Sequence, residues 1–213
     1  MIKLIAFDLD GTIGDTIPLC MRAFRKAVAS YTDHELSDNE IVQTFGLNEE
    51  GMIKQVVSDD HWKRALEDFY LIYEEMHMIC PHPFEGILGL INDLRARDKI
   101  VVLITGKGAG SCAITLKQFG MQNSFDRIET GSSEKNRKSE SMLALRQYYR
   151  IKPNEMIYVG DTVSDIEACN ATGIRCLSAA WATSTMRGQL DKCNFGYVFD
   201  SVLLLREYLL NEQ

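Results

Sequence analysis

Short apolar runs alternate along most of the chain with segments in which apolar residues recur at helical spacing. The runs have the length and continuity of strands buried on both faces of a sheet, and the first three are Lys3–Leu9, Ile100–Ile104 and Met156–Val159. The pattern predicts helices over residues 87–97, 139–149, 165–172 and 202–210, and further strands over residues 175–179 and 196–199. This alternation predicts an α/β fold, a doubly wound parallel sheet with a Rossmann-like core.

The pattern changes between Thr16 and His82, where no strand is predicted. Apolar residues recur there every three or four positions, beginning with Ile17, Cys20, Met21, Phe24, Ala27, Val28 and Tyr31. Further helices are predicted over residues 38–45, 49–57 and 61–78, and Pro81 and Pro83 mark the return to the alternating pattern. The chain is therefore expected to form an α/β core of residues 1–15 and 83–213 with an inserted, all-helical cap domain of residues 16–82.

The composition narrows the class of protein without identifying its chemistry. The chain has 213 residues, enough for a core with an insert, and its net charge of −7 disfavours nucleic acid or an anionic membrane as a partner. Its six cysteines form no C-x-x-C pair, and its apolar runs are too short to span a membrane. A cytoplasmic location is expected, and the oligomeric state stays open.

Four carboxylates follow the predicted strands, at the edge where ligands of open α/β sheets bind. Asp8 and Asp10 end the first apolar run, and Asp161 and Asp165 follow the third. Each aspartate alone is readily explained as a cap of a turn or helix. Two such charges about 4 Å apart repel by about 4 kcal/mol at an effective dielectric of about 20. The cluster therefore predicts a bound cation, and a ligand set made only of oxygen favours Mg²⁺.

Two further segments could hold an anion. The glycine-rich segment 104–111 lacks the residues of a Walker loop and of a dinucleotide fingerprint. It reads either as a flexible turn or as a phosphate-like site built from the Thr105 hydroxyl and the amides that begin at Gly106. The basic stretch 134–138 is either a solvated loop or a segment from which one lysine side chain points inward, towards the carboxylates. Lys138 is preferred because it adjoins a predicted helix, and Lys135 is its competitor.

The order of these features resembles the haloacid dehalogenase superfamily, in the helical-cap branch that includes phosphoglycolate phosphatase and β-phosphoglucomutase. The motifs that carry the resemblance are D-x-D-G-T at residues 8–12, the helical insert after it, T-G at 105–106, a lysine before a helix, and G-D-T-x-x-D at 160–165. The resemblance covers essentially the whole chain. The chain departs from the family pattern in two places. The frequent K-P-x-P around the lysine is absent, and Gly106 stands where asparagine often follows the threonine.

The resemblance implies a Mg²⁺-dependent phosphatase. Asp8 would be the nucleophile that becomes an aspartyl-phosphate, and Asp10 the general acid and base, whose protonated form is favoured by crowding among carboxylates. Asp165 would serve either as a metal ligand or as the group that orients the lysine. The metal ligands implied are Asp8, Asp10 through its backbone carbonyl, Asp161 and Asp165. The residues implied to bind the transferring phosphoryl group are Thr105, Gly106 and Lys138.

The expected substrate is the phosphomonoester of a small, phosphoglycolate-like metabolite. A sugar-phosphate mutase is the main alternative. A phosphonoacetaldehyde hydrolase, with a cap lysine such as Lys54 as a Schiff base, and a non-catalytic relative are less favoured. A receiver-type signalling domain is disfavoured because such domains have only about 120 residues and no G-D-T-x-x-D motif. Cap residues that could select the substrate include Arg22, Lys54 and Lys63.

Overall fold

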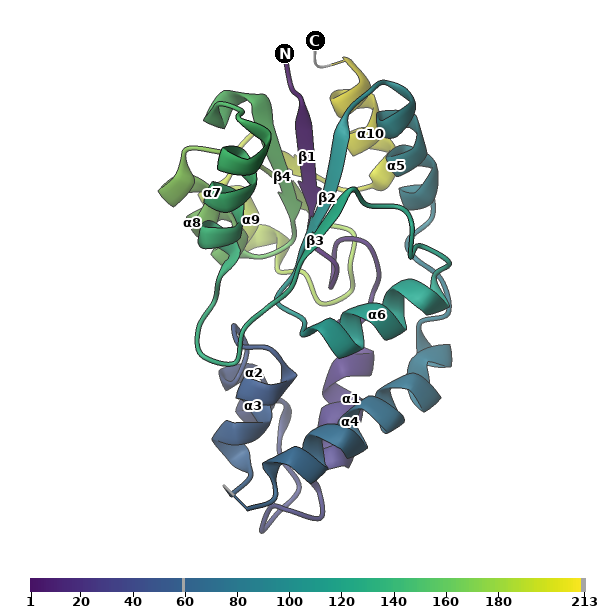
Figure 1. The fold of residues 1–213 in the computed structure, drawn as a ribbon, viewed down its shortest axis with the longest axis vertical. Coiled ribbons are helices and arrows are strands. Elements are labelled where there is room, and N and C mark those ends of the chain that lie inside the picture. Colours follow the sequence, from purple (N-terminus) through teal and green to yellow (C-terminus); the bar gives the residue numbers. More distant parts are fainter. Residues whose placement is uncertain (59, 212–213) are drawn as a thin grey trace.

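Six parallel strands form one sheet in the computed structural model, which describes residues 1–58 and 60–211. The strands are β1 (Leu4–Phe7), β2 (Ile100–Ile104), β3 (Arg127–Glu129), β4 (Met156–Gly160), β5 (Arg175–Ala179) and β6 (Val198–Phe199). Their order is β3-β2-β1-β4-β5-β6, so β1 lies between β2 and β4 (Figure 1). Phe7 pairs with Leu103 on one side and Val159 on the other, and the residues that follow these three therefore meet at one edge.

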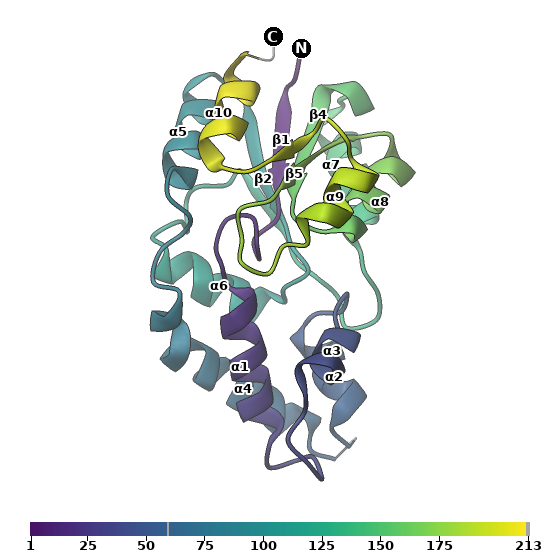
Figure 2. The same ribbon diagram turned by 180° about the vertical axis from the view of Figure 1, so that it is seen from behind.

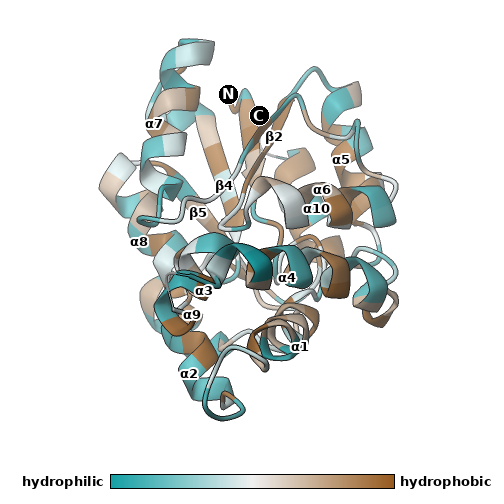
Figure 3. Cartoon of the chain, turned by 60° about the horizontal axis from the view of Figure 1, so that its bottom comes forward, coloured by the Kyte–Doolittle hydropathy of each residue, from teal (hydrophilic) through white to brown (hydrophobic). Residues whose placement is uncertain are grey.

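Helices cover both faces of the sheet. Side chains alternate along each strand, so that Ile5 joins the cluster containing α5 (Ile87–Ala96) and α10 (Val202–Asn211), and Leu4 joins the cluster on the opposite face. The helices on that opposite face are α7 (Lys138–Tyr149), α8 (Val163–Thr172) and α9 (Arg187–Cys193). Both layers are visible in Figures 1 and 2, and Figure 3 shows mostly brown, apolar strands between helices that carry both colours. The predicted doubly wound α/β fold is confirmed.

The segment between β1 and α5 contains helices and, among its described residues, no strand. Its helices are α1 (Ile17–Val28), α2 (Asp38–Gln43), α3 (Glu49–Val56), α4 (Trp62–Met76) and the 3-10 helix η1 (His77–Ile79). They lie beyond the carboxyl edge of the sheet (Figures 1 and 2). α4 packs along α1 and also contacts α6 (Ala109–Gln118), the helix that follows β2. The division of the chain at residues 16 and 82 stays a prediction.

Local sequence sets the turn between α2 and α3, which faces the sheet edge. The hydroxyl of Ser37 and the carboxylate of Glu40 form a capping box that starts α2. The side chain of Asn48 accepts a hydrogen bond from the Gly51 amide and starts α3. Between the two helices, Gly46 has a φ of +104°, which a residue with a Cβ adopts only with strain. α2 ends at Gln43, two residues before its predicted end.

The hydrophobic pattern missed β3, α6 and α9 in the core. In α6 two of the buried side chains, Ser111 and Thr115, are polar. β3 has three residues at the edge of the sheet, and two of them, Arg127 and Ile128, are exposed, so no buried apolar run marks it. In α9 the buried residue is Leu190, which leaves that helix without an apolar stripe. No helix in the described ranges is both long and apolar enough to cross a membrane.

A buried chain of hydrogen bonds joins η1 to the interior. The carbonyl of Cys80 can only accept, so the His77 Nδ1 atom, 3.0 Å away, carries the imidazole proton. The Nε2 atom then accepts from the Thr115 hydroxyl at 2.9 Å, and Thr115 accepts from the Tyr73 hydroxyl at 2.8 Å. Burial, assisted by the charge of Lys107, lowers the pKa of His77. The neutral imidazole therefore connects α4, α6 and the segment that returns to the core.

Replacing His77 by asparagine is expected to weaken the pH dependence of folding stability between pH 7 and pH 5. A histidine whose pKa is lowered by folding binds fewer protons when folded, so the wild type loses stability as the pH falls through the unfolded value of about 6.5. Urea denaturation of both proteins at several pH values measures this difference. The exposed His82 provides the matched substitution, His82→Asn, which is expected to leave the pH profile unchanged. Parallel profiles for wild type and His77→Asn would contradict the neutral, buried state of His77.

Candidate active site

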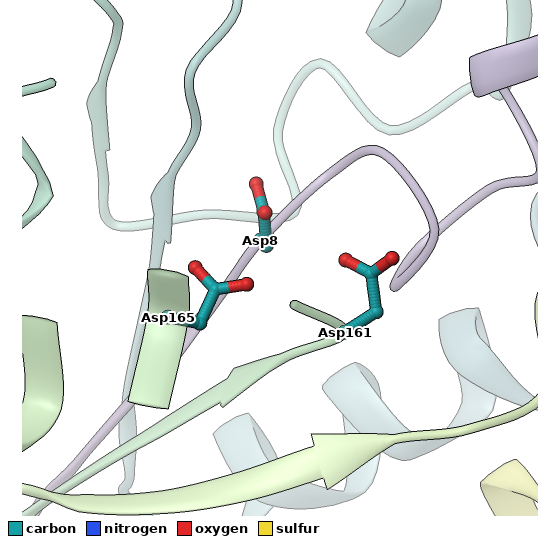
Figure 4. Close-up of side chains that lie close together, drawn as sticks. All are labelled: Asp8, Asp161 and Asp165. Atoms are coloured by element: carbon teal, nitrogen blue, oxygen red, sulfur yellow. The ribbon is translucent and has the colours of Figure 1, made fainter. Parts of the chain in front are cut away.

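Three buried aspartates meet at the carboxyl edge of the sheet. Asp8 follows β1, Asp161 follows β4, and Asp165 lies in the first turn of α8. Carboxylate oxygens from the three residues lie within 4.8 Å of one another, and Figure 4 shows the carboxylates facing a common space. Gly11 makes the approach possible, because its φ is +73° and a Cβ there would lie 2.1 Å from Asp161 Oδ2. The sequence correctly predicted that these aspartates converge.

Lys138 is the lysine that reaches the aspartates. It begins α7, and its Nζ atom lies 2.5 Å from Asp8 Oδ2 and 2.6 Å from Asp165 Oδ1. Burial acts to lower the pKa of Lys138, but the two carboxylates raise it above its ordinary value, so the group is an ammonium. Lys135, the competing candidate, forms an exposed ion pair with Glu140 instead.

Asp165 uses both of its oxygens within the protein. Its Oδ1 atom accepts from Lys138 and, at 3.0 Å, from the Tyr158 hydroxyl. Its Oδ2 atom accepts from the Thr162 amide at 3.1 Å and from the Thr162 hydroxyl at 2.7 Å, which closes a capping box at the start of α8. Burial acts to raise the pKa of Asp165, yet Lys138 and Thr162 hold it below its ordinary value. The contacts of Asp165 fit an orienting role better than that of a metal ligand.

The other two carboxylates of the cluster are less well compensated. Burial raises the pKa of Asp8 to about 7, against the opposing charge of Lys138. Burial, followed by the charge of Asp8, raises the pKa of Asp161 well above its ordinary value. The Asp161 side chain accepts a hydrogen bond from the Thr12 hydroxyl, at 3.4 Å. Oxygen donors with excess negative charge are the donor set of a hard divalent cation, so the cluster fits a metal of that kind.

Asp10 lies apart from that cluster and has its own partners. Its Oδ1 atom accepts from the Thr16 hydroxyl and lies 3.2 Å from Lys107 Nζ. The Lys107 ammonium is buried, 2.7 Å from Cys20 Sγ and 4.6 Å from the centre of the Tyr73 ring. The sequence of segment 104–111 does not match a nucleotide loop, and no role was predicted for Lys107. The signal that could have found it is a lysine flanked by glycines directly after a buried strand.

The loop after β2 places the two other predicted phosphate-binding residues. Thr105 is buried, and its hydroxyl oxygen accepts from the Lys107 amide at 3.1 Å. Gly106 borders the cavity described below, whereas Thr105 does not line it. The backbones at Gly106 and Gly131 lie close together, since a Cβ on Gly131 would lie 1.9 Å from the Gly106 carbonyl oxygen. That Thr105 and Gly106 bind an anion stays a prediction.

A cavity of about 180 Å³ separates the aspartates from the helical segment. Its floor includes Asp8, Asp10, Lys138 and Asp161. Six apolar side chains of the helical segment, called the roof here, cover it: Ile17, Phe24, Phe45, Leu47, Met52 and Phe69. The three cations that the sequence nominated for substrate selection do not line the cavity: Arg22, Lys54 and Lys63.

Glu49, at the start of α3, also lines the cavity and was not predicted. It is 5% exposed, and its carboxylate accepts from the Gly108 amide at 2.8 Å and from the Ser111 hydroxyl, at the start of α6. The neighbouring Asn48 amide donates to the Ser132 carbonyl at 2.9 Å. Burial raises the pKa of Glu49 against the charge of Lys107. α3 is thus fastened to the core beside the cavity.

Comparison with known proteins agrees with the fold and with the order of the motifs. A phosphoglycolate phosphatase from Chromobacterium violaceum is 24% identical over 212 residues, covering 93% of this chain and 96% of that protein. The crystal structure of a predicted phosphoglycolate phosphatase from Haemophilus somnus superposes with a TM-score of 0.79 at 20% identity, covering 100% of this chain and 98% of that one. The crystal structure of CbbY from Rhodobacter sphaeroides in complex with phosphate gives a TM-score of 0.77 at 16% identity, covering 94% of this chain and 95% of that one.

The family assignment rests on a match to a whole-family model rather than on these distant relatives. The model for haloacid dehalogenase-like hydrolases matches residues 5–179. That range includes the aspartates, Lys138 and the entire helical segment, and it agrees with the resemblance drawn from the motifs. The chain belongs to the haloacid dehalogenase-like hydrolase family.

Proposed function

We propose that the protein is a Mg²⁺-dependent phosphatase that hydrolyses the phosphomonoester of a small metabolite through an aspartyl-phosphate on Asp8. One observation carries this proposal: the Asp8 carboxylate lies on the cavity floor, 2.5 Å from the buried Lys138 ammonium and beside Asp161. A carboxylate can act as the nucleophile, an ammonium can offset charge on phosphoryl oxygens, and a second carboxylate can hold a metal. Phosphoryl transfer depends on this combination of positioning and charge.

The chain's own groups account for both halves of the reaction. A bond forms between an Asp8 oxygen and phosphorus as the bond from phosphorus to the alcohol breaks, and Asp10 gives its proton to the leaving oxygen. Asp10 then takes a proton from the water that attacks phosphorus, which releases phosphate and restores the Asp8 carboxylate. Lys138, oriented by Asp165, offsets charge on the phosphoryl oxygens. A Mg²⁺ ion held by Asp8, Asp161 and the Asp10 carbonyl supplies additional positive charge when bound.

Two further assignments belong to the same proposal. Thr105 and Gly106, at the end of β2, bind phosphoryl oxygens through the hydroxyl and the backbone amides. Residues 16–82 act as a cap on the core of residues 1–15 and 83–213, and the apolar roof excludes water from the reacting groups. The free state of all six cysteines supports a cytoplasmic location.

The cavity and the relatives guide the choice of substrate. Phosphoglycolate is the first compound to test, because curated relatives are named for it. A volume of about 180 Å³ is below the roughly 300–1,000 Å³ of sites for drug-sized ligands, which favours a small metabolite. A mutase must hold a second phosphate, yet no cation from the described residues of segment 16–82 lines the cavity. Lys54, which a Schiff-base mechanism would use, pairs with Glu50 outside the lining.

Metal removal tests the proposal. With Mg²⁺ the protein is expected to hydrolyse p-nitrophenyl phosphate and phosphoglycolate, and chelation is expected to slow both reactions at least about a hundredfold, because a catalytic metal contributes several kcal/mol. Steady-state rates before chelation, after it and after addition of Mg²⁺ measure the effect. Full activity in protein shown to be metal-free would contradict the metal dependence. Inactivity with Mg²⁺ across a broad set of phosphorylated metabolites would favour a non-catalytic relative.

A further inference from the structure

Segment 16–82 lines the cavity with the apolar roof, with Cys20 and Asn48, and with one carboxyl group. Among the described residues of segment 16–82, Glu49 is the charged residue that lines the cavity. Its oxygens accept from the Gly108 amide and the Ser111 hydroxyl, so the carboxyl group is fixed at the start of α6. The N-terminus of a helix is a favourable place for an anion. Here the protein's own side chain already occupies it.

The cations beside the cavity are already paired. In the part of the chain that the structure describes, the ammonium groups lining it belong to Lys107 and Lys138, and no arginine or histidine does so. Lys138 contacts Asp8 and Asp165. Lys107 lies 3.2 Å from Asp10 and is also subject to the charge of Glu49. A carboxylate or second phosphate on the leaving group would therefore meet apolar side chains, Asn48 and a carboxyl group, with no unpaired cation to compensate its desolvation.

We infer that the cavity selects phosphomonoesters of small, uncharged and largely apolar alcohols, and that Glu49 is the specificity-determining residue that discriminates against anionic leaving groups. The inference rests on the proposed phosphatase function and refines its substrate class. It separates this chain from the activity for which its curated relatives are named, because the leaving group of phosphoglycolate carries a carboxylate. The inference does not concern the transferring phosphate, whose proposed site lies beside Asp8 and Lys138 on the floor of the cavity.

The inference can be tested on the wild-type protein with three substrates of similar size. Phosphoglycolate is compared with its neutral carboxamide analogue and with isobutyl phosphate, which places two methyl groups where phosphoglycolate has two carboxylate oxygens. With saturating Mg²⁺, kcat/KM is expected to be at least about tenfold higher for isobutyl phosphate than for phosphoglycolate, with the carboxamide between them. Glycolate is the better leaving group in solution, so this order would arise from the cavity and not from intrinsic reactivity.

Variants identify the residues responsible. Glu49→Gln keeps the size of the side chain and is expected to raise the ratio of kcat/KM for phosphoglycolate over isobutyl phosphate at least about fivefold. Phe45→Lys adds a cation to the partly exposed edge of the roof and is expected to raise the same ratio. Val42→Lys adds the same charge to an exposed position outside the lining and is expected to leave the ratio unchanged. Because each ratio is taken within one protein, a general loss of stability or activity does not affect it.

The possible outcomes separate this inference from the function on which it rests. If the protein hydrolyses neither p-nitrophenyl phosphate nor any of the three esters, both the inference and the proposed function are overturned. Efficient phosphatase activity that favours phosphoglycolate over its neutral analogues would overturn the inference and leave the proposed function intact. A preference for neutral esters that is the same in Glu49→Gln would overturn the role of Glu49.

Discussion

Replacing Asp8 by asparagine is expected to reduce phosphatase turnover to below about a thousandth of the wild-type rate. The amide cannot serve as the nucleophile, so no acyl phosphate forms on residue 8. The amide also provides a weaker metal ligand than a carboxylate. Steady-state assays with p-nitrophenyl phosphate, together with mass spectrometry of acid-quenched protein for a covalent phosphate, measure both consequences.

Loss of activity in Asp8→Asn is expected without loss of the fold. Burial raises the pKa of Asp8 to about 7, which means that its charge is costly in the absence of a metal. A neutral amide of the same shape should therefore leave thermal stability in metal-free buffer unchanged or higher. Asp93→Asn is the matched control, because Asp93 pairs with Arg206 at a part-exposed position away from the cavity. Wild-type turnover in a folded Asp8→Asn protein would contradict the assignment of the nucleophile.

The features that the sequence revealed are those set by short stretches of chain. A run such as Ile100–Ile104 is buried on both faces, so its length and composition are enough to mark a strand. Parallel strands end at one edge, so strand direction places Asp8 and Asp161 at that edge, and Asp165 follows in the first turn of the next helix. The edge strand β3 and helix α9 contribute few buried side chains, and the same pattern therefore missed them.

The features that the sequence missed depend on contacts between distant segments. Lys107 owes its position to Asp10 and Cys20, which lie 97 and 87 residues earlier in the chain. Glu49 is buried because the turn before α3 approaches Gly108 and Ser111 from across the cavity. In sequence, Glu49 is one of two adjacent glutamates in the first turn of a helix, where acidic residues are common on exposed surfaces. No feature of the local sequence distinguishes Glu49 from its neighbour Glu50.

Replacing Lys138 by methionine is expected to lower kcat/KM about a hundredfold to a thousandfold, because the variant loses a fixed positive charge where phosphoryl charge develops. It should also destabilise the fold at neutral pH by about 3–5 kcal/mol, since a buried carboxylate is left without its partner. Lys135→Met removes an exposed ion pair with Glu140 and is expected to leave both stability and activity near those of the wild type. The pair of variants separates the two lysines that the sequence left in competition.

The pH dependence of the Lys138→Met effect distinguishes a lost ion pair from a lost packing contact. In the wild type the pKa of Asp165 is held below its ordinary value of 3.8, so the stabilisation from its charge is present above that pH and is lost as the pH falls through the folded value. Without Lys138, burial raises the pKa of Asp165, and protonation then relieves the unpaired charge at a higher pH than before. The stability difference between wild type and variant, measured by urea denaturation, should therefore be largest near pH 7 and shrink towards pH 4. A difference that is constant over this range would show that the methylene groups of Lys138, rather than its ammonium, hold the site together.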